Sequence, residues 1–482
     1  MSAILAKNGF IYIKKDIIPH EKYAKMKNIE AYTGNKKFTP YSFSIYSETR
    51  VNGTIYIKFP RRLGINLMKE YKIPLGKNMM LPGKAFTDKI TTNVKLYDYQ
   101  QDAVNTFIEK KKAGSFGGLL ILSTGAGKTI TSIEIARNIG MKCLIIVKVK
   151  SLAKQWKEEI LKNYDNVTVN IISGIPLKTA YKYIEESSFC ICVIKSIYSN
   201  KFKSEDFTPF GTVIIDEVHG ILAEKTLNMF NYISRSFIIG ITATPKVKTG
   251  LHYLLDWYIG PILFEIDKSY KGELPIVHMI KYKPSTAEIK EKYCKIIKFR
   301  VGLGVEGELD PTTTDINTTV NNKERYHIPM LKKCLANTEY KRIIVLCKYR
   351  KLIDNIYEEL NEPDLVGKFY SETNKIGLYE QGETLANKKM ILSVLALGKE
   401  SLNIIDCNCL IILNCPKVNK DIEGNWNTQA MDQVVGRCLR KKHEKSPHIY
   451  IINDGFAYYN RHYIDRLMYF NDIKKYKVLN NY

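Results

Sequence analysis

The sequence predicts an α/β protein with two parallel-sheet domains, preceded by a small, basic domain of mixed α and β structure. Two series of short, continuously apolar runs alternate with helix-like segments, which is typical of parallel sheets covered by helices. The first 92 residues lack this alternation. A chain of 482 residues, 45% hydrophobic and 25% charged, is long enough for about three globular domains.

The N-terminal residues 1–92 are predicted to form a basic domain that binds nucleic acid. Asn52-Gly53 is a hairpin signal in front of the alternating residues 54–59. Residues 1–90 contain 17 basic and 6 acidic side chains, a net +11 of the chain's formal +24. Such an excess favours contacts with phosphates. The candidate phosphate contacts are Lys14, Lys15, Arg61 and Arg62. For each of them, the alternative is that the charge only makes the surface soluble.

Aromatic residues interleave with the charged residues of segment 41–59. They are either stacking platforms for bases or core residues of strands. For alternating aromatics in strands, the core interpretation is the commoner one.

Residues 93–262 show the pattern of a doubly wound sheet. Residues 98–112 are helix-like, and segments of helix length separate the apolar runs that follow. The runs expected to be buried parallel strands are 117–123, 143–147, 189–194, 212–215 and 237–241.

A second series of the same kind is predicted in residues 341–482. Its expected strands are 342–347, 389–394, 409–413 and 448–452. Residues 263–340 contain a polar, turn-rich stretch, and we expect them to form a connection or insertion that leads into the second domain.

Composition limits the partners and the compartment. The formal charge of +24 favours a polyanion, although 60 of the 73 basic residues are Lys, a bias that AT-rich coding explains in part. No run of about 18 apolar residues exists, so no membrane-spanning segment is expected. The ten cysteines lack zinc-site spacing, and the pairs Cys190/Cys192 and Cys407/Cys409 are predicted to be small buried residues in a reducing, cytoplasmic compartment.

The strongest motif is STGAGKT, between an apolar run and a helix-like segment, which is the setting of a P-loop. Backbone N–H groups would surround phosphate oxygens, Lys128 would reach the β- and γ-phosphates, and the Thr129 hydroxyl would bind Mg²⁺. The full pattern has glycine where this chain has Leu122. The predicted nucleotide-binding residues are Ser123, Thr124, Gly125, Ala126, Gly127, Lys128 and Thr129.

The second motif is an apolar run that ends in Asp216 and Glu217. Asp216 would hold Mg²⁺, and Glu217 would orient and activate the attacking water. Paired acids after a strand can also cap the next helix, but the upstream P-loop favours the catalytic interpretation.

Two further segments complete the series. Thr242-Ala243-Thr244-Pro245 directly follows an apolar run and by itself indicates only a polar strand end. Arg437 and Arg440 are three residues apart, so they share one helical face and could clamp a γ-phosphate as arginine fingers. The alternative is a solvated basic face, but only 13 arginines occur in the chain, which favours a role for the planar guanidinium.

These four segments, in this order, resemble the motifs of superfamily 2 helicases over most of residues 94–455. Three features are similar to the XPB and UvsW types of DNA translocase: the DEVH box (residues 216–219), Gln433 and residues 255–261 (LDWYIGP). The chain is also similar to helicases of phages and large DNA viruses, including the poxvirus transcript-release type. Leu122 is usual in the XPB-like members. The chain departs from the family at Asn403, where the family has an aspartate that shares in ATP contact.

The resemblance implies two RecA-like domains that bind ATP and Mg²⁺ between them. Catalysis would fall to Lys128, Asp216, Glu217, Gln433, Arg437 and Arg440, and Gln100 would lie on the adenine side. Nucleic-acid contact or its coupling to ATP would fall to Gln155, Ser196, His219, Thr242 and Thr244, together with Arg61 and Arg62.

The implied activity is that of a nucleic-acid-stimulated ATPase. The expected protein is a monomeric helicase or translocase on double-stranded or branched DNA, in transcript release, repair or recombination, working with transcription or replication machinery in the cytoplasm, a viral factory or a virion. The alternatives are an RNA-directed helicase and a nucleic-acid-binding transcription accessory that does not hydrolyse ATP.

Overall fold

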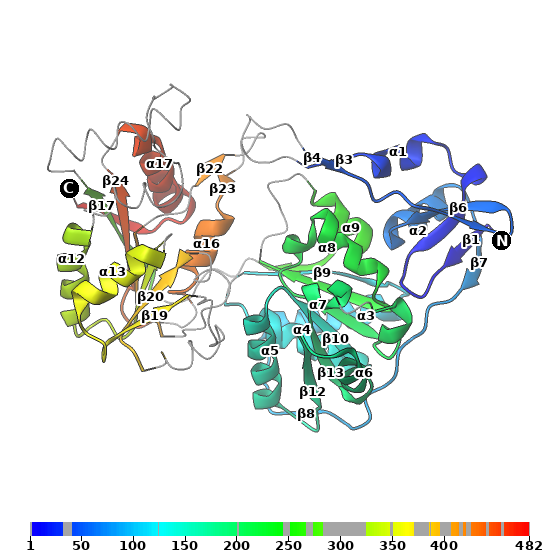
Figure 1. The fold of residues 1–482 in the computed structure, drawn as a ribbon, viewed down its shortest axis with the longest axis horizontal. Coiled ribbons are helices and arrows are strands. Elements are labelled where there is room, and N and C mark those ends of the chain that lie inside the picture. The colour runs from blue at the N-terminus through cyan, green and yellow to red at the C-terminus, as the bar shows by residue number, and fades with distance from the viewer. Residues whose placement is uncertain are drawn as a thin grey trace. The chain divides into compact units, whose positions relative to one another are not determined.

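The computed structural model describes residues 2–31, 41–123, 125–199, 202–243, 251–266, 273–282, 324–347, 350–370, 385, 387–395, 406–413, 418–420, 426–439, 443–454 and 457–481. The chain divides into two compact units, residues 1–268 and 269–482, and each is described by itself. Figure 1 shows their elements with the labels used below.

The N-terminal part of the first unit is a sheet of mixed direction with strand order β5-β6-β2-β1-β7. Asn52 and Gly53 both take left-handed conformations, and Val51 pairs with Thr54, so the predicted hairpin is present. The elements are β1 (Ala3–Leu5), β2 (Ile11–Lys14), β3 (Ile29–Ala31), β4 (Tyr41–Phe43), β5 (Glu48–Val51), β6 (Thr54–Phe59), β7 (Leu75–Asn78), α1 (Glu21–Lys27) and α2 (Arg61–Glu70).

The remainder of the first unit is a seven-stranded parallel sheet of order β12-β13-β10-β14-β15-β9-β16. Its strands are β9 (Gly117–Leu122), β10 (Cys143–Val147), β12 (Val169–Ile172), β13 (Phe189–Val193), β14 (Thr212–Ile215), β15 (Phe237–Thr242) and β16 (Ile262–Ile266). Its helices are α3 (Asp98–Lys112), α4 (Lys128–Ile139), α5 (Lys150–Asn163), α6 (Leu177–Glu186), α7 (Ile194–Ser199), α8 (Glu224–Leu227) and α9 (Tyr253–Tyr258). A small ladder joins β8 (Thr91–Thr92) to β11 (Tyr164–Asp165).

Helices cover both faces of this sheet, which explains its continuously apolar strands. One core cluster contains Phe107, Ile133 and Trp156 from α3, α4 and α5. The cluster on the opposite face contains Ile184 of α6 and Leu254 of α9. Because all strands run in the same direction, the segments that follow β9, β14 and β15 lie at one edge, the carboxyl edge of the sheet.

The N-terminal sheet shares its core with the parallel sheet. Phe10 and Phe43 belong to the same buried cluster as Phe230 and Tyr258. Arg235 is only 1% exposed, and its guanidinium carbon lies 4.8 Å from the ring centroid of Phe10 and 4.4 Å from that of Phe230. Removal of residues 1–92 would therefore uncover apolar surface on the domain that carries the P-loop.

The second unit is another seven-stranded parallel sheet, of order β19-β20-β18-β21-β24-β17-β25. Its strands are β17 (Ile276–Tyr282), β18 (Ile343–Cys347), β19 (Val366–Phe369), β20 (Met390–Val394), β21 (Cys409–Ile412), β24 (His448–Asp454) and β25 (Lys477–Asn481), with a small ladder of β22 (Asn419–Lys420) and β23 (Trp426–Asn427). Its helices are α12 (Glu324–Ala336), α13 (Arg350–Leu360), α16 (Gln429–Val435), α17 (Ala457–Met468) and a π-helical turn, η6 (Tyr469–Ile473).

The predicted fold class is confirmed, since both parallel sheets are present and a mixed sheet precedes them. The predicted strands agree with the structure to within two residues at each end. Sequence reasoning missed β12, β16, β19 and β25, and it placed β17 in a connection although β17 lies inside the second sheet. The domain limits at residues 92, 262 and 340 remain predictions.

The aromatic residues of segment 41–59 lie mainly in the core. Phe43, Tyr56 and Phe59 are all buried, which confirms the commoner of the two interpretations. The eight cysteines within the described residues are free and buried. No helix in the described part of the chain is long and apolar enough to cross a membrane.

Candidate functional site

The predicted P-loop connects β9 to α4. Gly125 and Gly127 take left-handed conformations with φ of 84° and 76°. The left-handed φ of Gly127 favours glycine, and a Cβ there would also displace the Gln100 amide, whose Nε2 would lie 2.2 Å away. Lys128 begins α4, and its Nζ donates to Leu122 O at 3.3 Å, which brings the ammonium back across the loop.

The other predicted loop residues are placed around these. Ser123 follows β9, Ala126 is buried within the loop, and Thr129 lies in the first turn of α4. Thr124 is outside the described residues. A loop of this kind ahead of a helix N-terminus is suited to phosphate oxygens.

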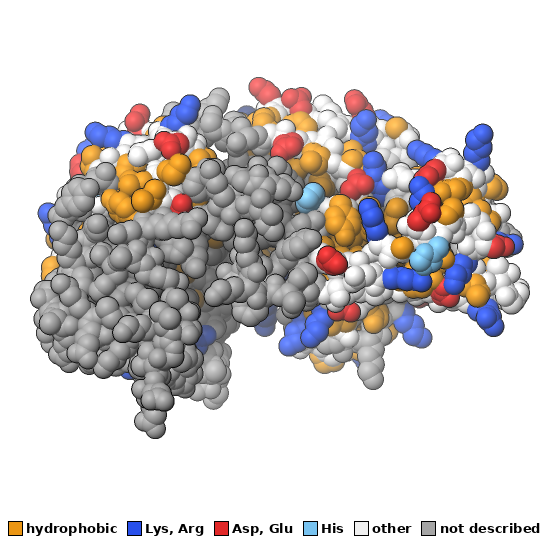
Figure 2. All heavy atoms as spheres, turned by 90° about the horizontal axis from the view of Figure 1, so that it is seen from above, with side chains coloured by type: hydrophobic (Ala, Val, Ile, Leu, Met, Phe, Trp, Pro, Cys, Tyr) orange, Lys and Arg blue, Asp and Glu red, His pale blue; other side chains and the backbone are white. Residues whose placement is uncertain are grey.

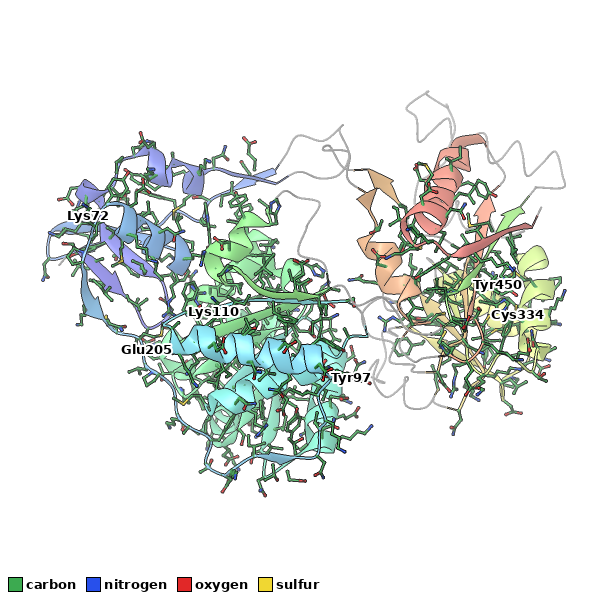
Figure 3. All side chains as sticks on the ribbon, turned by 180° about the vertical axis from the view of Figure 1, so that it is seen from behind. Lys72, Tyr97, Lys110, Glu205, Cys334 and Tyr450 are labelled. Atoms are coloured by element: carbon green, nitrogen blue, oxygen red, sulfur yellow. The ribbon has the colours of Figure 1, made fainter. Side chains whose placement is uncertain are left out.

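Gln100 holds the P-loop from behind. Its Oε1 accepts a hydrogen bond from Tyr97 N at 3.0 Å, and its Nε2 donates to Ala126 O at 3.3 Å. Tyr99, which sequence reasoning did not single out, also donates its hydroxyl to Ala126 O, at 3.1 Å. The Tyr97 ring stacks on Tyr99 and is exposed at the start of α3, as Figure 3 shows.

The two predicted carboxylates directly follow β14, and β15 lies between β14 and β9. Burial and the charge of Glu217 raise the pKa of Asp216 to about 6, whereas a hydrogen bond from Trp156 and the charge of Lys128 act in the opposite direction. The influence of Lys128 on Asp216 means that the first and second motifs share one electrostatic environment.

His219 connects the second motif to the third. Its Nδ1 lies 3.3 Å from Glu217 Oε2 and 3.0 Å from Thr242 Oγ1. Thr242 is the last residue of β15, and Glu217 has a left-handed φ of 46°. The structure therefore brings His219, Glu217 and Thr242 together, while Thr244 is outside the described residues.

Trp156 is a site residue whose role sequence reasoning missed. It lies on α5, is 3% exposed, and donates from Nε1 to Asp216 Oδ2 at 2.9 Å. The other oxygen, Oδ1, accepts from Glu217 N at 2.9 Å. Asp216 lies in the second motif, but a bond between the helix after β10 and the end of β14 follows only from the neighbouring positions of these strands.

Gln155 and Ser196, two of the predicted nucleic-acid contacts, lie on helices that follow strands of this sheet. Gln155 is half-buried on α5, next to Trp156. Ser196 on α7 is 6% exposed, and its hydroxyl accepts a hydrogen bond from Gly174 N at 3.4 Å. Their roles at a nucleic-acid strand remain predictions.

Arg61 and Arg62, which were predicted to contact phosphate, open helix α2. Arg61 Nη1 donates to the carbonyls of Arg235 and Ser236, both at 3.0 Å, and its guanidinium lies over the Phe116 ring. Arg62 forms an ion pair with Asp256. Both arginines therefore join the N-terminal sheet to elements of the parallel-sheet domain. The Arg61 charge is used in this contact, whereas the Arg62 side chain is 33% exposed and its contact with phosphate remains a prediction.

The remaining N-terminal candidates are ordinary surface residues. Lys15 forms an exposed ion pair with Glu48, and Lys14 is half-buried at the end of β2. On the face that Figure 2 shows, the Lys and Arg side chains over the N-terminal part lie among acidic and apolar ones. The excess charge is therefore dispersed on this face, and phosphate contact there remains a prediction.

The fourth motif belongs to the second unit. Gln433 lies on α16, Arg437 follows the end of this helix and is 3% exposed, and Arg440 is outside the described residues. Beside Gln433, the Asp432 carboxylate accepts hydrogen bonds from Tyr469 and Thr428 and pairs with Lys474. These contacts fix α16 to the C-terminal segment of the chain.

Within the described residues there is no cluster of three or more His, Cys, Asp or Glu side chains that could hold a metal ion.

Comparison with known proteins places both units in one class. Residues 93–247 match the family described as Type III restriction enzyme, res subunit, and residues 326–442 match the family described as Helicase conserved C-terminal domain. The two matches contain the P-loop and carboxylate motifs of the first unit and Gln433 and Arg437 of the second. The chain belongs to the superfamily 2 helicases, which are ATPases that act on nucleic acid.

Its relatives include helicases of large DNA viruses. A protein of Acanthamoeba polyphaga mimivirus that is named as an ATP-dependent RNA helicase is 28% identical over 422 residues, 86% of this chain and 73% of the relative. A protein of Invertebrate iridescent virus 6 named as a helicase is 25% identical over 89% of this chain and 91% of its own length. The DNA 3'-5' translocase XPB2 of Sulfurisphaera tokodaii is 26% identical over 81% of this chain and 88% of its own length.

The solved structure of the Mycobacterium smegmatis helicase Lhr, bound to ssDNA and AMP-PNP, has a similar fold. The TM-score is 0.51 at 14% identity, over 74% of this chain and 46% of the Lhr chain. This chain thus spans less than half the length of that helicase. The likeness supports the two RecA-like domains and, at this identity, only the fold.

Proposed function

We propose that this chain is an ATP-driven DNA helicase or translocase that hydrolyses ATP at the carboxyl edge of its first parallel sheet. The observation that carries the proposal is the buried carboxylate pair beside the P-loop. Asp216 has a raised pKa because it is buried and because Glu217 repels its negative charge. A divalent cation that accompanies a triphosphate would relieve both effects.

The donors around Asp216 suit Mg²⁺. Each Asp216 oxygen accepts one hydrogen bond from a neutral N–H group, so lone pairs remain for an ion. Mg²⁺ prefers oxygen ligands and is commonly held by one or two protein groups plus phosphates. Asp216 and the Thr129 hydroxyl would hold the ion, which would neutralise charge on the β- and γ-phosphates.

The chain's own residues divide the remaining work. Lys128 would bind the β- and γ-phosphates, and Glu217 would orient the attacking water and accept its proton. His219, between Glu217 and Thr242, would pass the state of this site to the end of β15. In the second unit, Arg437 and Arg440, which are three residues apart in the sequence, would stabilise charge on the γ-phosphate, and Gln433 would act with them.

DNA is the proposed substrate. The supporting observation is the similarity to the XPB2 translocase, which extends over 81% of this chain. The formal charge of +24 agrees with either nucleic acid. RNA is the competing substrate, because the mimivirus relative is named as an RNA helicase.

Stimulation of the ATPase by different nucleic acids tests the proposal. Duplex DNA, single-stranded DNA and RNA of equal length are compared at one salt concentration, because phosphate binding depends steeply on salt. We expect DNA to stimulate hydrolysis most. Equal or greater stimulation by RNA would contradict DNA as the preferred substrate and favour an RNA-directed helicase.

The variants Lys128→Ala and Glu217→Gln separate a motor from a binding accessory. Glu217→Gln should lower the stimulated rate roughly 10²- to 10⁴-fold, since it removes the general base, but leave DNA binding measurable. Asp165→Asn, an exposed change on β11, is the control that should keep the parent rate. Background hydrolysis that neither nucleic acid nor the two variants alter would favour the non-hydrolysing accessory.

A further inference from the structure

We propose that Trp156 is a positioning residue that couples occupancy of the ATP site to the grip of helix α5 on the nucleic-acid strand. The inference rests on the proposed function, because it assumes that nucleotide and nucleic acid bind to the same unit. Its basis is a side-chain hydrogen bond that joins α5 to the second motif, from Trp156 Nε1 to Asp216 Oδ2 at 2.9 Å.

Asp216 is attached to the β10–α5 segment at two points. Asp216 N donates to Ile146 O of β10 at 3.0 Å, and its carboxylate accepts from Trp156 on the helix that follows β10. The ladder between β10 and β14 is regular up to the pair of Ile146 and Ile215. We therefore expect a displacement of the Asp216 carboxylate to be transmitted to α5 through the Trp156 hydrogen bond and the adjoining β10.

Helix α5 is expected to respond as a rigid body because one face of it is packed against the sheet. Ser151, Ala153, Trp156 and Ile160 are buried against the sheet. The neighbouring Gln155 is only half-buried, and Lys150 is exposed where the helix begins. A phosphate backbone that contacts the open face would thus act on the same helix whose closed face holds Asp216.

An indole N–H is well suited to this link. It is a donor only, so it cannot compete with the carboxylate for a cation, and it brings no charge of its own. When Asp216 turns a lone pair toward an ion, the single Trp156 bond must lengthen or the ring must follow. The ring is 3% exposed among packed neighbours, so we expect its displacement to be passed to α5.

Thermodynamic linkage requires the effect to be reciprocal. If the bound nucleotide changes the affinity for DNA by a certain factor, DNA must change the affinity for the nucleotide by the same factor. Couplings of this kind typically amount to about 5- to 150-fold. Loss of the Trp156 N–H should reduce both factors together, without a requirement that either ligand bind poorly alone.

The test compares Trp156→Phe, which keeps a ring but removes the N–H, with Trp257→Phe, a matched change on α9 far along the chain from both motifs. The dissociation constant of a duplex DNA oligonucleotide is measured with and without Mg²⁺ and AMP-PNP. That of Mg²⁺·AMP-PNP is measured with and without the duplex.

We expect coupling of at least about fivefold in the parent and in Trp257→Phe, and a factor close to 1 in Trp156→Phe. A purely structural role would weaken both ligands, or lower the thermal midpoint, with the coupling factor unchanged, and would overturn the inference. A parent with DNA-stimulated ATPase but normal coupling in Trp156→Phe would also overturn it. A parent without stimulated ATPase would instead overturn the proposed function.

Tryptophan fluorescence gives a readout that does not depend on turnover. The chain has three tryptophans, so Trp156 is the sole emitter when Trp257 and Trp426 are both changed to Phe. Mg²⁺·ADP should shift its emission in the absence of DNA, and the duplex should shift it in the absence of nucleotide. An emission that neither ligand changes would contradict the link.

Discussion

Asp216 in the first unit and Asp432 in the second are both held by an aromatic side chain, but they differ in what else surrounds them. The bonds that the structure gives Asp216 come from the neutral N–H groups of Trp156 and Glu217, and its pKa is raised. Asp432 accepts from the Tyr469 hydroxyl at 2.7 Å and also pairs with Lys474.

The difference separates a carboxylate that serves a ligand from one that serves the fold. A buried charge that is hydrogen-bonded only to neutral donors lowers the stability of the fold. A protein retains such a charge where it is needed to bind a cation. A charge that is matched by an ammonium and by hydroxyl donors stabilises the contact between its elements. Asp432 therefore belongs to the support of α16, and Asp216 to the chemistry.

Asp216→Asn gives the largest expected effect and the first way to break the comparison. Loss of the Mg²⁺ ligand should lower nucleic-acid-stimulated ATPase by at least about 10²-fold, because metal stabilisation of the phosphates is worth several kcal/mol. The thermal midpoint should stay the same or rise, since a desolvated carboxylate that is repelled by Glu217 is removed. Activity within a few-fold of the parent, or a clearly lowered midpoint, would contradict this assignment.

Asp432→Asn should have the opposite profile. Loss of the charged bonds to Lys474 and Tyr469 should destabilise the second unit by about 2 kcal/mol. Hydrogen exchange should show lost protection in α16 and η6, while the first unit and its binding of ATP stay unchanged. Asp472→Asn, an exposed change on η6, is the matched control. Equal loss of protection in both variants would contradict the assignment of Asp432 as a residue that stabilises α16.

The motifs could be predicted from the sequence because their chemistry is local. The order of strand, glycine loop and helix around Lys128, and the paired acids after an apolar run, each occupy one short segment. The buried parallel strands were equally visible, since a strand covered by helices on both faces is apolar throughout.

The misses depend on partners that are distant in the sequence. The Trp156–Asp216 bond depends on β10 lying beside β14, which no local pattern states. Arg61 was predicted to contact phosphate because a charge in the sequence carries no sign of its partner. Pro60 ahead of a helix-compatible segment was a usable signal that Arg61 and Arg62 begin a helix.

The smallest expected effect is a difference in how the two units respond to acid. The folded-state pKa of Asp216, about 6, lies above its ordinary value, so its protonation favours the folded first unit as the pH falls from about 7 to 4. Burial and the adjacent His448 lower the pKa of His278 in the second unit to about 4. His278 therefore contributes stability above pH 6.5 that is lost as the pH falls through about 4.

These opposite pH dependences can be checked by hydrogen exchange, which reports the unfolding free energy of each unit separately between pH 7 and 4. His278 Nε2 lies 2.8 Å from His448 Nδ1 and its ring stacks on Tyr450, so a proton on His278 disturbs the ladder between β17 and β24. His278→Phe should remove about 1–2 kcal/mol of the acid-induced loss in the second unit, with allowance for its partial exposure to solvent. His252→Asn, at an exposed histidine of the first unit, is the control. If His278→Phe leaves the acid slope of the second unit intact, the histidine pair is not its source, and the contrast between the units rests on the two aspartates alone.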